Sequence, residues 1–266
     1  MRTLLLLIVA TLAAQDLRVL SYNVRFPSTG DGANLWSLRK DLFIDSIKDA
    51  NPDLIGTQEL FELQGNCIVE KLPQYAWFGL SRRGNHEDEH MGVFYRKDKL
   101  KLIESGNFWL SPTPEVVMSS AWGMSLPRMV TWGLFELTAT KKRLYFVNTH
   151  FPHRREDEAA RLECAKVLQA FLAKLPKTIP TILTGDFNAG TASQTYQFLT
   201  QSLTDAAPAN SFGTFHGFTG KPGADRIDWV LYTGKLGFKS ATILTMNDAG
   251  RYPSDHFPVV AAFSVR

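Results

Sequence analysis

The chain has 266 residues, of which 44% are hydrophobic and 12% aromatic, and its formal net charge is +3. This composition excludes a fibrous or disordered protein and provides enough apolar residues for a large core. So small a positive charge gives no argument for nucleic-acid binding, although a phosphate pocket needs only local positive charge. No Pro-, Ser- or Gly-rich linker divides the chain, so we expect one domain over residues 15–266.

Residues 1–14 have the pattern of a secretory signal peptide. Arg2 precedes an apolar run over 4–12, which is too short to span a bilayer and leads into two alanines. We therefore predict a secreted or periplasmic protein without a stable membrane anchor; a buried first strand or helix is the alternative. Export permits a disulfide, but Cys67 and Cys164 lie in separate helix-like segments, which favours two unlinked thiols.

The first half of the chain alternates strands and helices. Residues 17–24 alternate like a strand that ends at the polar Asn23, and the apolar spacing over 36–50 is helical. A second strand over 53–59 ends at Glu59, and a helix is expected from Cys67 to Leu72. Further strand-like runs and two surface loops follow: strands at 75–80, 91–95, 100–110 and 129–137, and loops at 82–90 and 111–127.

The second half begins in the same manner. A strand over 144–150 ends at His150, a helix follows over 156–175, and an apolar strand over 181–186 ends at Asp186. Asn23 and His150 are 127 residues apart, and so are Glu59 and Asp186. We interpret this spacing as a duplication, with coincidence as the alternative because the local identity is low. Two similar α/β halves would then bring their polar strand ends to one pocket.

The polar residues that follow Gly185 combine an acid with an amide. Asp186 and Asn188 are two residues apart, so in extended geometry their side chains point the same way. Together they offer oxygen ligands and an N–H donor, which suits a divalent metal beside a phosphate. Side-chain turns in a loop are the alternative interpretation.

The C-terminal third adds two acids and an acid–histidine pair. Asp225 and Asp228 flank an Arg-Ile pair that opens a strand, and Asp255-His256 precedes the final apolar strand. A histidine at such a place is more often structural. Directly after an acid and at a strand edge, a catalytic role for His256 is the better interpretation.

Six motifs, taken in order, resemble the endonuclease/exonuclease/phosphatase family. They are Ser-Tyr-Asn-Val (21–24), Thr-Gln-Glu (57–59), Asn-Thr-His (148–150), Gly-Asp-Phe-Asn (185–188), Arg-Ile-Asp (226–228) and Ser-Asp-His (254–256). The resemblance covers the whole predicted mature chain. It implies a four-layer α/β sandwich in which two packed mixed β-sheets are flanked by helices, with the active site at one edge.

The resemblance and the residue chemistry together assign roles. Asn23, Glu59 and Asp255 would bind the metal, and an all-oxygen set without cysteine favours Mg²⁺ or Mn²⁺. Three further residues would handle the phosphate and the water. Asp186 would orient or deprotonate the attacking water, Asn188 would hold a phosphate oxygen, and His256 would bind the phosphate or act as base.

Three assignments concern the leaving group and the supporting residues. His150 would protonate the leaving oxygen. Arg128 could bind a phosphate oxygen, although a solvated strand-end arginine is an equal alternative. Asp225 and Asp228 are three residues apart, so in an extended strand only one of them can face the pocket. We predict that Asp228 supports His256, because a carboxylate inside the strand is held more rigidly than one at the loop edge.

Other polar clusters are expected to be solvated. His153, Arg154 and Arg155 are interpreted as an exposed helix start, and His86 and His90 as a hairpin tip rather than a metal site. Among the tryptophans, Trp122 is the one expected at the surface.

The sequence therefore predicts a secreted, Mg²⁺-dependent, monomeric hydrolase of phosphate esters. A phosphodiesterase acting on nucleic acid is the first hypothesis. A phosphodiesterase or phosphatase for a small molecule or a lipid headgroup is the second. A binding protein without catalysis is the least favoured, since all the expected site residues are present.

Overall fold

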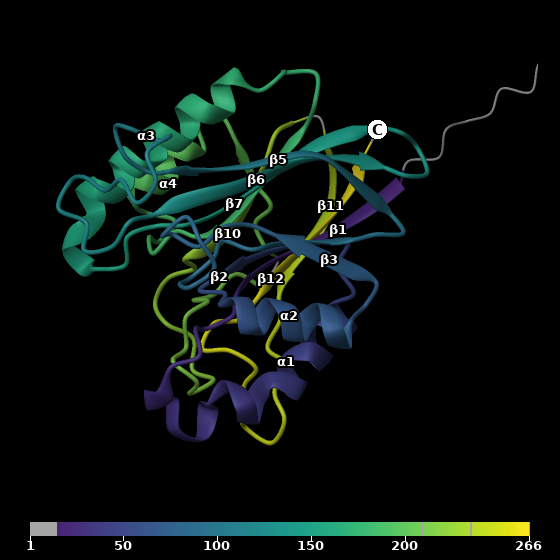
Figure 1. Cartoon of the computed structure of the whole chain (residues 1–266), viewed down its shortest axis with the longest axis vertical. Helices are drawn as coiled ribbons and strands as arrows, with labels where there is room; N and C mark the ends of the chain where they lie inside the picture. Colours follow the sequence, from purple (N-terminus) through teal and green to yellow (C-terminus); the bar gives the residue numbers. More distant parts are fainter. Residues whose placement is uncertain (1–14, 209, 235, 266) are drawn as a thin grey trace, which may run out of the picture.

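The computed structural model describes residues 15–208, 210–234 and 236–265. The predicted signal peptide lies outside these residues. Two six-stranded mixed sheets pack face to face, and helices cover their outer faces (Figure 1). Helices α1 and α2 lie on one side, and α3 and α4 on the other, so the predicted four-layer α/β sandwich is confirmed. Within the described residues, no helix is long and apolar enough to cross a membrane.

The first sheet has the strand order β11-β12-β1-β2-β4-β3, and the second has the order β5-β6-β7-β8-β10-β9. The strands of the first sheet are β1 (Gln15–Asn23), β2 (Leu54–Gln58), β3 (Tyr75–Phe78), β4 (Val93–Arg96), β11 (Leu236–Ile243) and β12 (Val259–Val265). Those of the second sheet are β5 (Leu100–Trp109), β6 (Met129–Leu137), β7 (Arg143–His150), β8 (Thr181–Asp186), β9 (Thr204–Asp205) and β10 (Asp228–Tyr232). The helices are α1 (Trp36–Ala50), α2 (Glu62–Lys71), α3 (Glu158–Lys174) and α4 (Gln194–Leu199), with 3-10 turns η1 (Thr29–Asn34) and η2 (Arg155–Asp157).

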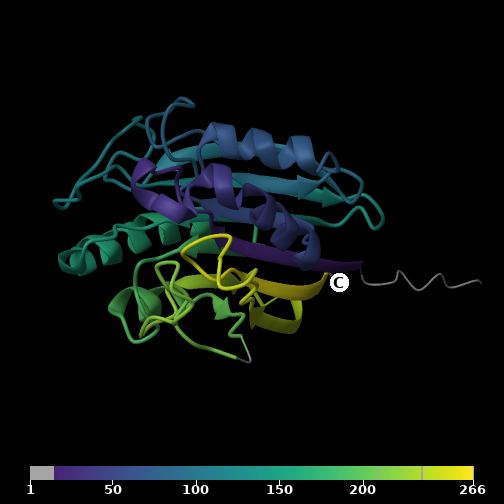
Figure 2. The ribbon, with the colours of Figure 1, turned by 90° about the horizontal axis from the view of Figure 1, so that it is seen from below.

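The two sheets have the same pairing pattern. Strands β1 and β2 are parallel, as are β7 and β8, and every other neighbouring pair in both sheets is antiparallel. The last strand of the chain, β12, returns to lie beside β1, as β6 lies beside β7 (Figure 2). The duplication expected from the 127-residue spacing is therefore present in the topology.

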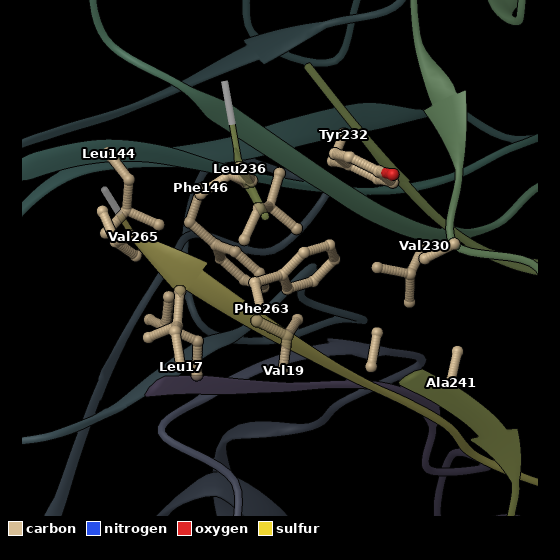
Figure 3. Packing of buried hydrophobic residues seen from close by; sticks show 14 of the residues in the cluster. Leu17, Val19, Leu144, Phe146, Val230, Tyr232, Leu236, Ala241, Phe263 and Val265 are labelled. Carbon is tan, nitrogen blue, oxygen red and sulfur yellow. The ribbon is translucent and has the colours of Figure 1, made fainter. Parts of the chain in front are cut away.

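The core lies between the sheets, where their inner faces meet. Figure 3 shows side chains of β1 and β12 packed against those of β7 and β10, including Val19, Phe263, Phe146 and Val230. Two further apolar clusters fill the space beneath α1 and α2 and beneath α3. Alternate residues of each central strand therefore face a helix layer or the opposite sheet, which explains why these strands are apolar throughout.

A buried polar contact joins the central strands of the two sheets. Asn148 of β7 accepts a hydrogen bond from Gln58 Nε2 at 2.7 Å and donates to the Thr57 carbonyl at 2.7 Å. Thr184 Oγ1 of β8 donates to the same Asn148 oxygen at 3.0 Å. Gly56 leaves room for this contact, since a Cβ there would lie 2.0 Å from Thr184 Oγ1. The contact fixes β2 against β7 and β8 near the ends that carry the polar residues.

The predicted elements differ from the observed ones in a few places. The helix at 36–50 is confirmed. The strand expected from Asp225 begins only at Asp228, and neither β11 nor α4 was predicted. Cys67 and Cys164 are free thiols, as expected.

Replacement of Gly56 by alanine should strain the contact between the sheets. The new methyl group would overlap Thr184 Oγ1, and overpacking of this kind costs about 1–3 kcal/mol. We expect the free energy of unfolding of Gly56→Ala, measured in urea, to fall by this amount. Gly234→Ala is the control, because a Cβ there has nothing within 4 Å. Equal stability of the two variants would contradict a close approach of the sheets at Gly56.

Candidate active site

Polar residues from both halves meet where the parallel strands end. Asn23 ends β1 and Glu59 follows β2, while His150 and Asp186 end β7 and β8. Asp228 begins β10 and pairs directly with Asp186 across the ladder. The resulting pocket has a volume of about 740 Å³. The pocket brings together all the residues predicted for the site except Asn23 and Asp228, which lie just behind its wall and bond to Asp186 and His256. The residues that line the pocket are Arg25, Phe26, Glu59, Phe61, Arg82, Glu89, Leu126, Arg128, His150, His153, Asp186, Asn188, Phe215, Ile227, Asp255 and His256.

Asn23 and Glu59 form an acidic corner with Asp255. Asn23 Nδ2 donates to Glu59 Oε1 at 3.1 Å and to Asp186 Oδ2 at 3.0 Å, while its oxygen accepts from the backbone N–H of Arg25. Asn23 therefore presents an amide N–H to the carboxylates and positions them. An oxygen ligand at Asn23 would require this amide to turn over.

The acidic corner fits a hard divalent cation. Glu59 has a φ of 59°, a strained conformation, and its carboxylate accepts from Asn23 and from the backbone N–H of Phe26 in the pocket that Asp255 also lines. Burial and the neighbouring Glu59 raise the pKa of Asp255, although Arg25 Nε lies 3.8 Å from its Oδ2. Two partly buried carboxylates that disfavour each other's charge, with Asp186 nearby and no sulfur ligand, are the donors that Mg²⁺ or Mn²⁺ prefers. Elsewhere in the pocket, Asp186, Asp228 and His256 have donor atoms within 4.8 Å of one another, a second group that could share an ion.

His256 and Asp228 form a buried ion pair. His256 Nδ1 lies 2.9 Å from Asp228 Oδ2, and His256 Nε2 lies 3.8 Å from Asp186 Oδ2. Burial opposes a charge on the ring, but Asp228 and Asp186 outweigh it and raise the pKa of His256 to about 10. His256 is therefore an imidazolium at neutral pH.

Asp228, rather than Asp225, stands behind His256. The backbone N–H of Asp228 donates to Thr214 Oγ1, which holds the start of β10 in place. Among the described residues, His256 forms its ion pairs with Asp228 and Asp186, whereas the Asp225 carboxylate lies beside Gly190. The contact predicted from the strand geometry is thus present, although Asp225 precedes the strand instead of facing its opposite side.

Asp186 is the most enclosed acid of the pocket. Its Oδ1 accepts from the backbone N–H of Asn188 at 3.0 Å and its Oδ2 from Asn23. Burial and the neighbouring Asp228 raise the pKa of Asp186, and His256 opposes this rise. Asn188 has a φ of 48° and donates through Nδ2 to the Phe151 carbonyl. One N–H of its amide remains for a ligand.

The surroundings of His150 disfavour its charged form. His150 Nε2 lies 3.6 Å from Asp186 Oδ2, and its Nδ1 is buried without a partner among the described residues. Burial, Arg128 and His256 keep the pKa of His150 well below its ordinary value. His150 is therefore neutral in the free site, and protonation of a leaving group by His150 would need a bound anion to offset these cations.

Arg128 is a buried cation without an acidic partner. Only 3% of its surface is exposed, and no carboxylate of the described residues lies within 4.0 Å of its guanidinium. Its Nη2 contacts His153 Nδ1 at 3.0 Å, and its Nη1 has no partner within the same residues. The alternative of a solvated arginine is therefore wrong. His153 is exposed, as predicted, but it also lines the pocket beside Arg128.

The loop over 82–90 is not a solvated hairpin tip along its whole length. Its middle is exposed, but Arg82, Glu89 and His90 are buried, because Arg82 and Glu89 face the pocket and His90 packs beneath Trp77. His90 Nδ1 contacts the Leu60 carbonyl. No pattern in the sequence indicated this, since the charged residues of the loop follow no regular spacing. Trp122 is at the surface, as expected.

Comparisons with known proteins agree with this geometry. Residues 20–256 match the model of the Endonuclease/Exonuclease/phosphatase family. The chain is 33% identical to a family protein of Bacteroides thetaiotaomicron of known structure, with a TM-score of 0.90 and coverage of 96% of this chain and 99% of that one. It is 34% identical to a mannosyl-6-phosphatase of the same species, with a TM-score of 0.85 and coverage of 92% and 98%. Xenopus laevis nocturnin is 23% identical over 93% of this chain and 72% of its own length.

Replacement of Asp228 by asparagine should lower the pKa of His256. Asp228 is the strongest of the groups that favour the imidazolium, so its loss lets burial bring the pKa of His256 below about 10. The charged form is then lost at a lower pH. An NMR titration of the ring resonances in metal-free protein measures this directly. Asp225→Asn is the control and should leave the His256 titration unchanged. The reverse pattern would transfer the supporting role to Asp225.

Proposed function

The chain belongs to the endonuclease/exonuclease/phosphatase family of phosphate-ester hydrolases, and on this premise we propose that it is a divalent-metal-dependent phosphatase for small phosphorylated molecules. The observation that carries the proposal is Arg128. A guanidinium that is almost fully buried and lacks an acidic partner is unfavourable unless an anion binds to it. Arg128 shares its pocket with His150, His256 and Asp186, so the anion is expected where these residues converge.

The residues of the pocket divide the reaction between them. Arg128 and the imidazolium of His256 hold the phosphoryl oxygens and stabilise the charge that develops on them. Asp186, with its raised pKa, is suited to take a proton from the attacking water near neutral pH. The water oxygen bonds to phosphorus as the ester P–O bond breaks. The bound phosphate offsets the neighbouring cations, so His150 takes up a proton when the substrate binds and passes it to the leaving oxygen, which departs as a hydroxyl group. The proton that Asp186 took from the water then returns to His150, whose Nε2 lies 3.6 Å from Asp186 Oδ2.

Glu59 and Asp255 would hold the divalent cation. When bound, the cation supplies further withdrawal of charge from the phosphoryl group. Asn23 keeps Glu59 and Asp186 at a fixed separation through its two amide hydrogen bonds.

The charges around the pocket favour a small substrate. Nucleic-acid backbones are held by tracks of unpaired basic residues. Here Arg25 is paired with Asp31 at 2.7 Å, and Arg82 is paired with Glu89 at 2.7 Å. No lysine lines the described pocket. The similarity to a mannosyl-6-phosphatase supports the same choice.

A nuclease remains the second candidate, as the sequence first indicated. Phe215 is 47% exposed at the edge of the pocket, near Phe26 and Phe61. Exposed aromatic rings at the mouth of a phosphate site are suited to stacking on bases. Export, which residues 1–14 predict, is compatible with either activity and stays a proposal. The same holds for the expected monomeric state.

A panel of phosphate esters tests the proposed function. With Mg²⁺, hydrolysis of p-nitrophenyl phosphate and of sugar phosphates should exceed that of bis-p-nitrophenyl phosphate by about tenfold or more, corresponding to a modest difference in transition-state binding. DNA and RNA should be poor substrates. EDTA should abolish activity, and Mg²⁺ or Mn²⁺ should restore it. Faster hydrolysis of nucleic acid, or full activity in EDTA, would contradict the proposal.

Replacement of Arg128 by methionine should separate stability from activity. Removal of a buried, unpaired charge in favour of an apolar side chain stabilises a protein by about 1 kcal/mol or more. Loss of the phosphate contact should lower kcat/KM by roughly 100-fold. Arg143→Met is a suitable control, because Arg143 is half exposed and faces Glu136 at 3.6 Å. A less stable Arg128→Met protein that keeps its activity would show that Arg128 has a structural role instead.

A further inference from the structure

Arg82 and Glu89 form a second polar group in the catalytic pocket. They lie at the two ends of the loop between β3 and β4, and both line the pocket that contains Arg128 and His150. Arg82 is 9% exposed and Glu89 is 8% exposed. The mechanism proposed above leaves both residues without a role.

The loop holds this pair in one position. The backbone N–H of Arg82 donates to the Glu89 carbonyl at 2.9 Å, and Trp109 Nε1 donates to the Arg82 carbonyl at 2.8 Å. Asp88 accepts from Arg82 Nε and from the backbone N–H of Glu89. Because the backbone is fixed at both ends, the two side chains are preorganised.

Each side chain retains unused hydrogen-bonding capacity. Arg82 Nη2 contacts Glu89 Oε1 at 2.7 Å, but Arg82 Nη1 is buried without a partner among the described residues. Within the same residues, Glu89 Oε2 accepts no hydrogen bond. A buried donor and a neighbouring acceptor are therefore both open to a ligand in the pocket.

The charge of the group indicates the kind of ligand. Arg82 and Arg83 face Asp88 and Glu89, so the group is close to neutral, and a second phosphate would meet the Glu89 carboxylate. A cation would meet Arg82 and the nearby Arg128. A neutral group that both accepts and donates hydrogen bonds satisfies Arg82 and Glu89 together, and hydroxyl groups do this.

We propose that Arg82 and Glu89 bind neighbouring hydroxyl groups of the leaving group, and that the substrate is the phosphate ester of a polyol such as a sugar. This inference rests on the proposed function, since it places the phosphate at Arg128 and His256. Phe26, Phe61 and Leu126 line the same pocket and offer apolar surface to the C–H faces of such a molecule.

The test compares polyol phosphates with a phosphate ester that lacks hydroxyl groups. The substrates are glucose 6-phosphate, mannose 6-phosphate, ribose 5-phosphate, glycerol 3-phosphate and myo-inositol 1-phosphate, with n-hexyl phosphate and p-nitrophenyl phosphate as references. We expect kcat/KM for at least one polyol phosphate to exceed that for n-hexyl phosphate by tenfold or more. If every polyol phosphate is hydrolysed no faster than n-hexyl phosphate, the inference is wrong.

Variants then assign the preference to this pair. Glu89→Gln and Arg82→Lys should each lower kcat/KM for the preferred polyol phosphate by about 10- to 100-fold, mainly through KM, because a buried hydrogen bond to the hydroxyl group is lost. Hydrolysis of n-hexyl phosphate should change less than threefold. Arg83→Gln is the matched control: Arg83 contacts Asp88 in the same loop, but its side chain is 59% exposed.

The outcomes separate the two proposals. A wild-type enzyme that hydrolyses none of these esters with Mg²⁺ would overturn the proposed function itself. Activity on the references, with equal losses for polyol and hexyl esters in Glu89→Gln and Arg82→Lys, would overturn only the inference. Circular dichroism and thermal unfolding of each variant exclude misfolding as the cause.

Discussion

The contact between the two parallel strand pairs is the constraint on which the site depends. Parallel strands end at the same edge of a sheet, so β1 with β2 and β7 with β8 each bring two polar residues to one edge. The Asn148 side chain bonds to β2 across the sheets, and Gly56 allows the close approach. Asn23, Glu59, His150 and Asp186 therefore come from four strand ends whose separations are set by the core.

The close approach of these strand ends explains the electrostatics of the pocket. Burial raises the pKa of Asp186 and Asp255 and lowers that of His150, while His256 keeps its proton because Asp228 and Asp186 face it. Arg128 has no such partner among the described residues. The free site therefore holds charges that are only partly compensated, an arrangement that favours the binding of a phosphate ester and a cation and is unfavourable for stability in their absence.

The sequence predicts the parts of the site that depend on strand geometry. An apolar run that ends in a polar residue identifies Asn23, Glu59, His150 and Asp186, and a place inside the strand favours Asp228 over Asp225. The burial of Arg128 and the inward position of Glu89 depend on which distant segments cover them, and no local pattern encodes this. The orientation of the Asn23 amide depends likewise on Arg25, Glu59 and Asp186 together. Strand β11 was missed because its middle residues, 238–240, are exposed and its apolar alternation is weak.

The duplication also orders the residues around the pocket. Each half places an acid after the second strand of its parallel pair: Glu59 after β2, and Asp186 at the end of β8. In each half an antiparallel strand lies beside the first strand of the parallel pair: β12 beside β1, and β6 beside β7. A cation precedes each of these strands, His256 before β12 and Arg128 before β6.

An acid also stands at the start of the strand beyond the second strand of each pair. Asp228 begins β10 and faces His256, while Glu89 precedes β4 and lines the same pocket as Arg128. The two cations differ because Asp228 bonds directly to its histidine, whereas Glu89 bonds to Arg82. One topology thus yields a paired imidazolium in one half and an unpaired guanidinium in the other, and this difference leaves Arg128 available to the phosphate.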